Sequence, residues 1–521
     1  MAFARVACRA QVGLAAPLVQ VEVSLAPGLP AFCIVGLPAM VVREAKERVR
    51  AALLNSRFEF PAGRITVNLA PADLPKEGGR FDLPIAIGVL LASRQLDGER
   101  AGASAAACEF YGELGLTGEL KPVPGLLPAA AQARHAGHEL IVPRANAAEA
   151  HAAAPHRVRA ADHLLDVCGH LSGGRVLGPH GAPAADANGG GNGGADQAPG
   201  GGASAARLDL ADVRGQAHAK RALLIAAAGG HSLLLIGPPG CGKSMLAQRL
   251  PGLLPPLSES EALEVAAIAS VSAAGFRGPA VRPFRAPHHS TTVPALVGGG
   301  ARARPGEVSL AHRGVLFLDE LPEFGRGVLE ALREPLETGV IQVARAALQT
   351  QYPAEFQLIA AMNPCPCGGR GDPQRSCRCT PALLRRYHAR LSGPLLDRLD
   401  LQVEVPRLAG EAFDAPPGEA LDSATAAQLV GRARALQLAR AGLCNARLAE
   451  AQAGRWCVPD AVGRRVLETA MRRLKLSGRA RSRVLRVART IADLEERPAI
   501  GAKQVAEALL LRCLDRAAPG G

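Results

Sequence analysis

Short apolar runs alternate with helix-forming stretches through the middle of the 521-residue chain. Three of these runs are continuous enough to predict strands that are buried on both faces, as in a parallel sheet. They lie at Ser232–Ile236, Val315–Leu318 and Gln357–Ala361. Buried strands that alternate with helices predict an α/β architecture for this part of the chain.

After Pro406 the apolar positions recur with a helical period, and many arginines lie between them. Helices are predicted at Ser423–Leu448, Pro459–Leu474 and Arg479–Glu496. The last hundred residues are therefore expected to be all-helical.

Residues 171–206 are rich in glycine and alanine and have almost no large apolar side chains. Such a segment cannot offset the entropy that ordering costs, so it is predicted to be a flexible linker. The expected domains are an N-terminal domain (1–170), this linker (171–206), an α/β core (207–406) and a helical C-terminal domain (407–521).

The composition indicates an anionic partner. The chain has 60 Lys and Arg against 47 Asp and Glu, a formal net charge of +13, and residues 421–521 alone hold 19 against 9. Aromatic residues make up 3%, which disfavours base stacking and favours contact with a phosphate backbone. No apolar run reaches the ~20 residues of a membrane span, and the first residues do not resemble a secretory signal. The cysteines are scattered, as is usual in a reducing compartment. We therefore expect a cytoplasmic protein without a membrane partner.

A phosphate-binding pattern, G-x-x-x-x-G-K-[ST], occurs between a predicted strand and a predicted helix, the context that the pattern requires. Lys243 is expected to reach the β- and γ-phosphates of ATP, and the Ser244 hydroxyl to bind Mg²⁺. Backbone N–H groups of the glycine-rich loop and the helix N-terminus supply the remaining positive potential. The loop residues are Gly237, Pro238, Pro239, Gly240, Cys241 and Gly242.

Two adjacent carboxylates follow the predicted strand Val315–Leu318. Ligands bind at the carboxyl ends of strands in open α/β sheets, so both side chains are expected near the phosphate loop. Asp319 is predicted to hold Mg²⁺, and Glu320 to orient and deprotonate the attacking water. Together the two motifs predict ATP hydrolysis.

The order GPPGCGKS, GVLFLDELPEF, LIAAMNPCPCG, LSGPLLDRLD resembles the AAA+ ATPases of the magnesium-chelatase-like type. The stretch RPFRAPHHSTTVPALVGGG is closer still to the bacterial YifB/ComM family. The resemblance covers nearly the whole chain, and it implies an AAA+ core with a helical lid that works as a hexameric ring.

The resemblance also implies roles for further residues. Asn363 matches the sensor-1 position, which positions the lytic water, and Arg398 matches the arginine finger, which reaches the γ-phosphate of the neighbouring subunit. Arg479 matches the sensor-2 position of the lid. Taken without the resemblance, each arginine is more simply a solvated surface charge. The adenine pocket is implied at Val213, Gly215 and Gln216.

Within this family the ComM proteins are ring helicases that drive DNA branch migration during natural transformation, and this function is implied by resemblance. Two inserts, Arg282–Arg304 and Glu337–Gln351, are expected to face the ring pore, the second as a β-hairpin. Arg302 and Arg345 are candidate DNA contacts or ordinary solvated charges. A chelatase-type motor and a protein-remodelling ring remain as alternatives.

Four cysteines lie within fifteen residues as two C-x-C pairs, a spacing tighter than in most zinc sites. They are predicted either to bind one structural Zn²⁺ or to remain free thiols. The four are Cys365, Cys367, Cys377 and Cys379.

The N-terminal domain resembles the Lon protease proteolytic domain, an α+β fold of the ribosomal S5 domain 2-like type, at residues 68–79, 112–125 and 138–146. Lon chemistry needs a serine nucleophile activated by a lysine. Here the nucleophile region reads GGRFDLPIA, and Leu127 occupies the lysine position. We therefore expect a degenerate domain without protease activity.

Overall fold

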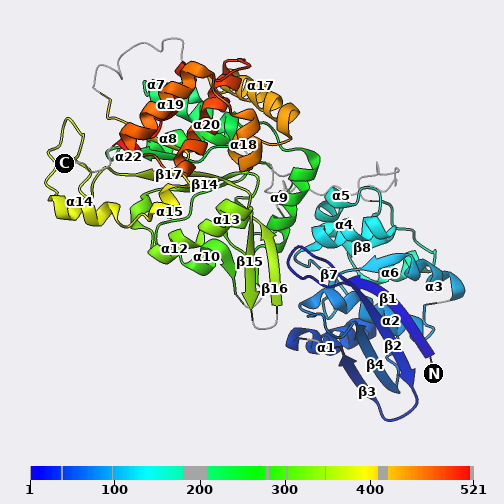
Figure 1. Cartoon of the computed structure of the whole chain (residues 1–521). Helices are drawn as coiled ribbons and strands as arrows, with labels where there is room; N and C mark the ends of the chain where they lie inside the picture. Colours follow the sequence, from blue (N-terminus) through cyan, green and yellow to red (C-terminus); the bar gives the residue numbers. More distant parts are fainter. Residues whose placement is uncertain are drawn as a thin grey trace, which may run out of the picture. The chain divides into compact units, whose positions relative to one another are not determined.

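The computed structural model describes residues 2–36, 39–96, 98–179, 208–276, 278, 281–300, 303–345, 348–408 and 421–516. Most of the linker predicted at 171–206 lies outside the described residues. The chain divides into two compact units, which Figure 1 colours along the sequence. Unit 1 comprises Met1–Gly200, Glu259–Ala280 and Ala346–Tyr352, and unit 2 comprises Gly201–Ser258, Val281–Arg345 and Pro353–Gly521.

Unit 1 is built on a mixed seven-stranded sheet of order β3-β4-β2-β1-β5-β8-β9. Strands β1, β2 and β4 pair antiparallel, whereas β5, β8 and β9 extend the sheet with parallel pairing. Alternate residues of β2 and β4 are buried, the pattern of strands that cover a core on one face. The strands are β1 (Ala2–Arg9), β2 (Leu18–Ala26), β3 (Ala31–Val35), β4 (Arg64–Ala70), β5 (Cys108–Phe110), β8 (Glu139–Pro143) and β9 (Val158–Ala161).

Helices complete the core of unit 1. Helix α2 packs on β1 and β2, and ten of its eleven residues are buried because its sequence, DLPIAIGVLLA, is apolar almost all round. Helix α9 packs on α4 and α5, and the Ser270 hydroxyl donates to Glu149. The helices are α1 (Met40–Asn55), α2 (Asp82–Ala92), α3 (Gly98–Ala106), α4 (Leu126–Ala136), α5 (Ala147–Ala153), α6 (Leu164–Leu171) and α9 (Glu259–Val271).

Unit 2 contains a five-stranded parallel sheet of order β11-β14-β17-β10-β18. The three strands predicted from apolar runs are present, with shifts of one residue at an end, and all their residues are buried. Because β14, β17 and β10 are neighbours, their carboxyl ends lie side by side at one edge of the sheet. The strands are β10 (Leu233–Ile236), β11 (Phe284–Arg285), β14 (Val315–Leu318), β17 (Gln357–Met362) and β18 (Leu401–Glu404).

Two predicted inserts contain short elements. The first holds a two-stranded sheet of β12 (Gly298–Gly299) and β13 (Arg304–Pro305), and Arg302 lies outside the described residues. The second is a hairpin, as predicted, of β15 (Val340–Arg345) and β16 (Leu348–Pro353). Its turn and the Arg345 side chain lie outside what the structure describes. Further short helices of unit 2 are α10 (Val293–Val297), α11 (Glu307–Leu310), α12 (Arg326–Ala331), α13 (Arg333–Thr338), α14 (Pro381–His388) and α15 (Gly393–Leu396).

The described part of the C-terminal region is helical, as expected, and α17 and α20 pack on α7 in the same hydrophobic core as the sheet. Helix α17 ends at Ala441 rather than near Leu448, because Gly442 adopts a left-handed φ of 70° that terminates it. Each described helix is too short or too polar to span a membrane. The helices of this core are α7 (Ala217–Gly229), α8 (Lys243–Leu253), α17 (Ser423–Ala441), α18 (Glu450–Trp456), α19 (Ala461–Leu474), α20 (Gly478–Leu494), α21 (Ala502–Leu510) and α22 (Cys513–Arg516).

Candidate nucleotide-binding site

The glycine-rich loop connects the carboxyl end of β10 to the first turn of α8. Gly240 and Gly242 have φ angles of 76° and 96°, a left-handed conformation that only glycine adopts without strain. A Cβ added at either position would meet no atom within 4 Å, so conformation rather than crowding requires glycine there. The loop thus presents the N-terminus of an eleven-residue helix, where phosphate groups are stabilised.

The Lys243 side chain folds back over this loop and is buried. Its Nζ donates to the carbonyl oxygens of Gly237 and Pro238 at 2.7 and 2.9 Å, and to Asn363 Oδ1 at 3.2 Å. Burial lowers the pKa of the Lys243 ammonium. Because its oxygen acceptors are all uncharged, the ammonium is well suited to bind an anion, which fits a nucleotide phosphate.

Ser244 and Asp319, the two residues predicted to hold Mg²⁺, contact each other. The Ser244 hydroxyl, in the first turn of α8, donates to Asp319 Oδ2 at 2.7 Å, directly after β14. A hydroxyl and a carboxylate are hard oxygen ligands of the kind that Mg²⁺ prefers. The two side chains therefore fit Mg²⁺ as ligands. The fold brings them together from positions 75 residues apart in the sequence.

Glu320 follows Asp319 directly and has a left-handed backbone φ of 53°. Its side chain is 52% exposed, and its Oε2 lies 3.4 Å from Nδ1 of His289. The carboxylate is therefore open to water at the end of β14. The approach of His289 was not predicted, since the two residues are 31 positions apart in the sequence.

Asn363 follows β17 and lies at the phosphate loop, where its side-chain oxygen accepts from Lys243. The Tyr387 hydroxyl donates to the Asn363 backbone carbonyl at 3.3 Å and so holds the main chain at this point. The three sequence motifs thus meet at the carboxyl ends of adjacent strands.

The implied adenine segment lies against the same loop. Gln216 donates from Nε2 to the carbonyl oxygens of Pro406, at 2.7 Å, and Cys241, at 3.4 Å. Val213 is buried, and a Cβ on Gly215 would approach Leu408 to 3.0 Å. These contacts connect the segment both to the phosphate loop and to the chain after β18.

The two implied arginines are not brought to this site within one chain. Arg398 is only 9% exposed. Its guanidinium donates to the Pro394 carbonyl at 2.6 Å and forms an ion pair with Glu337. Its buried Nε has no hydrogen-bond partner. Arg479 is exposed in the first turn of α20 and makes no hydrogen bond to the described residues of the site.

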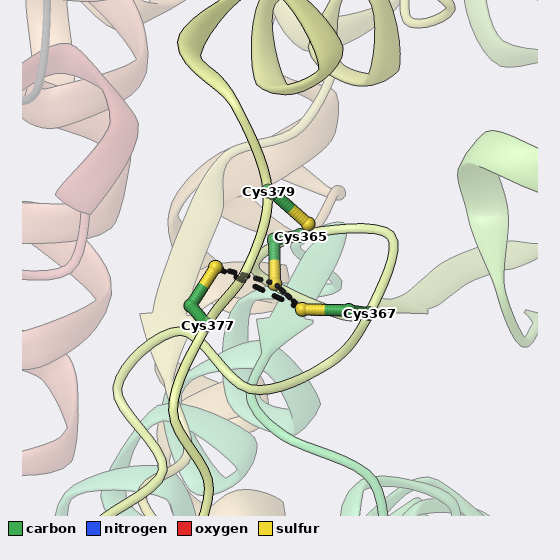
Figure 2. A group of neighbouring side chains, drawn as sticks. All are labelled: Cys365, Cys367, Cys377 and Cys379. Atoms are coloured by element: carbon green, nitrogen blue, oxygen red, sulfur yellow. Dashed lines mark hydrogen bonds between the residues drawn. The ribbon is translucent and has the colours of Figure 1, made fainter.

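The four cysteines gather beside the site, in the loop after Asn363 (Figure 2). The Sγ atoms of Cys365 and Cys367 are 3.4 Å apart, and that of Cys377 lies 3.8 Å from Cys367 and 3.7 Å from Cys365. All four sulfurs, including that of Cys379, lie within 4.8 Å of one another. Burial raises the pKa of Cys365, whereas a hydrogen bond from the Gly369 backbone lowers the pKa of Cys367 to about 6.

Family comparisons divide the chain into three matching regions. The family described as magnesium chelatase, subunit ChlI, matches residues 209–413, its C-terminal part matches residues 420–512, and a further ChlI family matches residues 21–146. Most of the residues on which the nucleotide site was built fall in the first region.

Similarity to individual proteins extends over the full chain. It is 48% identical over 518 residues to the competence protein ComM of Haemophilus influenzae, and 48% identical over 519 residues to the protein YifB of Salmonella typhimurium. Each alignment covers 99% of this chain and 98% of the relative. A 187-residue stretch is 26% identical to the DNA replication licensing factor mcm6 of Dictyostelium discoideum, covering 36% of this chain and 18% of that protein. With near-complete coverage at this identity, the chain belongs to the YifB/ComM family of magnesium-chelatase-like AAA+ proteins.

Proposed function

We propose that the protein is an ATP-driven ring motor that acts on DNA in the cytoplasm, as a ComM-like helicase that promotes branch migration. The ATPase part is supported above all by one observation, the 2.7 Å contact between Ser244 and Asp319 next to the contact between Lys243 and Asn363. These four side chains come from three separate sequence motifs, and the neighbouring strands β14, β17 and β10 bring them together.

In the proposed reaction, each residue acts on ATP or on the attacking water. Lys243 and the loop N–H groups bind the phosphates, and Ser244 and Asp319 hold Mg²⁺, which supplies charge neutralisation when it is bound. Glu320 accepts a proton from water, and Asn363 orients that water. The exposed Glu320 carboxylate is suited to accept this proton, because Ser244 donates its hydrogen bond to Asp319 and not to Glu320.

The two arginines implied by the family pattern do not reach the site within one chain, which supports a ring in which a neighbouring subunit completes it. Arg398 donates to the Pro394 carbonyl and pairs with Glu337 rather than with the phosphate loop of its own chain. We assign Arg398 as the finger that acts on the neighbouring subunit and Arg479 as the sensor of the helical C-terminal lid, in a hexamer. An arginine supplied to the γ-phosphate is worth about 10³–10⁵ in rate in related phosphoryl-transfer enzymes.

DNA is the proposed substrate because charge and similarity agree. The net charge of +13 favours a polyanion, and two relatives carry names that refer to competence and to DNA replication. The exposed Arg304 lies in the first insert, next to β12 and the glycines. Such cations without aromatic partners suit backbone contact rather than base readout.

We assign unit 1 as a degenerate Lon-like domain. The region that would carry the nucleophile forms the turn Gly79–Phe81 and the start of α2, where Asp82 is buried and bonded to Arg48. Neither a serine nor a lysine occupies the matching positions, so we expect no proteolysis.

DNA binding by the purified full-length chain tests the substrate. Filter binding to single-stranded and forked DNA, with and without ATP, is expected to show ATP-dependent retention, and both DNAs are expected to stimulate ATP hydrolysis. A branch-migration assay on a recombination intermediate is expected to show strand exchange that the Lys243→Ala protein lacks. If the protein hydrolyses ATP but neither binds DNA nor is stimulated by it, a chelatase-type or protein-remodelling motor would be favoured.

A further inference from the structure

The cysteine cluster is geometrically matched to one tetrahedral metal ion. With metal–sulfur bonds of about 2.3 Å, the sulfurs of a tetrahedral zinc site lie about 3.8 Å apart. The sulfurs of Cys365, Cys367 and Cys377 are separated by 3.4, 3.7 and 3.8 Å, and the Cys379 sulfur lies within 4.8 Å of each of them. The space among them suits a single ion rather than a cluster of several metal atoms.

The loop has no other evident reason to bring these thiols together. Cys367 and Cys377 are exposed residues, yet their sulfurs are turned toward each other (Figure 2). A thiol is only a weak hydrogen-bond donor and acceptor, so the contacts between sulfurs contribute little by themselves. The Arg370 backbone N–H donates to the Cys365 sulfur at 3.4 Å, a contact that stabilises a metal-bound thiolate.

The same loop is packed against the nucleotide site. Gly368 has a left-handed φ of 74°, and a Cβ there would lie only 2.7 Å from Pro239 Cδ in the phosphate loop. Cys365 follows Asn363 by two residues, and Asn363 contacts Lys243. At the other side of the loop, the buried Asp372 pairs with Arg407 at 2.9 Å.

We propose that Cys365, Cys367, Cys377 and Cys379 bind one structural Zn²⁺, and that this ion keeps Asn363 in position beside the phosphate loop. Four thiolates select a soft or borderline ion over Mg²⁺, and a closed tetrahedral set leaves no open position for chemistry. Asn363 therefore acts on the substrate, whereas the zinc and its ligands are positioning groups.

The metal part is tested by elemental analysis of the full-length protein purified without added metal. About one zinc per chain is expected, with neither iron nor sulfide. Cys367→Ser and Cys377→Ser are expected to lose it, and Cys377→His is expected to retain it because imidazole also binds zinc. Cys33→Ser, an exposed cysteine in β3, is the matched control and is expected to keep the metal. Should folding fail in the serine variants, Co²⁺-loaded wild-type protein is expected to show the visible absorption of tetrahedral cobalt thiolate.

Iron with sulfide, absence of any bound metal, or zinc retained by Cys377→Ser would each overturn the assignment. The proposed positioning of Asn363 by zinc rests on the proposed ATPase function, and it is tested by ATPase kinetics rather than by metal content. In Cys377→Ser, kcat for ATP is expected to fall about 10-fold while the nucleotide Kd changes little, and Cys377→His is expected to restore kcat. Unchanged kcat in a zinc-free variant would refute the positioning role. A wild-type protein with zinc but without ATPase activity would refute the proposed function and leave the metal site intact.

Discussion

Asp319 and Glu320 are adjacent in the sequence but lie in different surroundings. Asp319 accepts from the Ser244 hydroxyl and from the Glu320 backbone N–H, so both of its oxygens are engaged. Glu320 is half exposed, and its carboxylate lies near the His289 ring. This difference supports metal binding for the first carboxylate and water activation for the second.

We expect Glu320→Gln to bind ATP as the wild-type protein does and to lose about 10²–10⁴ in kcat, because an amide cannot accept the proton from water. Nucleotide binding measured by fluorescence and turnover measured by phosphate release separate the two effects. Glu323→Gln is the matched control, since Glu323 is a nearby carboxylate that pairs with Arg390 outside the site. Near wild-type turnover in Glu320→Gln would show that another group is the base.

At the residue scale, the sequence carries most information where it is local. The phosphate-loop glycines, Lys243 and Ser244 lie within eight residues, and the turn itself requires them. The pairing of Arg398 with Glu337 in α13 joins residues 61 positions apart, so no short sequence pattern predicts it. The approach of His289 to Glu320 was missed for the same reason.

At the scale of elements, a buried polar network joins the sheet to the helical region of unit 2. Asp400, just before β18, accepts from His231 Nδ1 at 3.1 Å and from Arg483 of α20, and His231 Nε2 contacts Thr490 at 2.8 Å. Burial alone would raise the pKa of Asp400, but His231 and Arg483 hold that pKa well below its ordinary value. The carboxylate is thus charged in the folded protein.

We expect Asp400→Asn to lower the free energy of unfolding of unit 2 by about 3 kcal/mol at pH 7, because it leaves the Arg483 charge without its buried partner. Because the pKa of Asp400 is lower in the folded than in the unfolded protein, its ionised carboxylate stabilises the fold above about pH 4. This stabilisation is lost as the pH falls further. Urea unfolding at a series of pH values should therefore show a constant difference above about pH 5 that shrinks below about pH 4.

The exposed pair of Arg432 and Glu496 provides the control for this measurement. Glu496→Gln is expected to cost at most about 1 kcal/mol, because solvent screens exposed ion pairs. If the two substitutions lowered the free energy of unfolding equally, the Asp400 network would not stabilise the contact between the sheet and the helical region of unit 2.

The elements themselves were predictable to different degrees. The strands β10, β14 and β17 are continuous apolar runs, and burial on both faces is the simplest environment for such runs. Helix α9 belongs to unit 1 although its sequence lies inside the predicted α/β core. Its residues, ESEALEVAAIASV, are apolar on more than one side, so the pattern does not indicate which surface the helix covers.

At the scale of the whole molecule, the proposed arginine finger does not reach the phosphate loop of its own chain. The phosphate loop, both carboxylates and Asn363 meet at one edge of the sheet, but Arg398 is buried against Glu337. If a finger must enter from a neighbour, the ion pair with Glu337 has to open when subunits assemble. Assembly is then a requirement for turnover, and the requirement can be tested without knowing the shape of the ring.

Mixing two inactive variants provides this test. Lys243→Ala is expected to lose ATP binding and Arg398→Ala to lose turnover alone, yet each retains the half of the site that the other lacks. In a randomly mixed head-to-tail ring, about one quarter of the interfaces combine an intact loop with an intact arginine, so about a quarter of the wild-type ATPase rate is expected. A mixture of Lys243→Ala with Glu320→Gln is the control, because both changes damage the same half and no interface is complete. Phosphate release that stays at background in the first mixture, with both proteins shown to assemble together, would contradict sites shared between subunits.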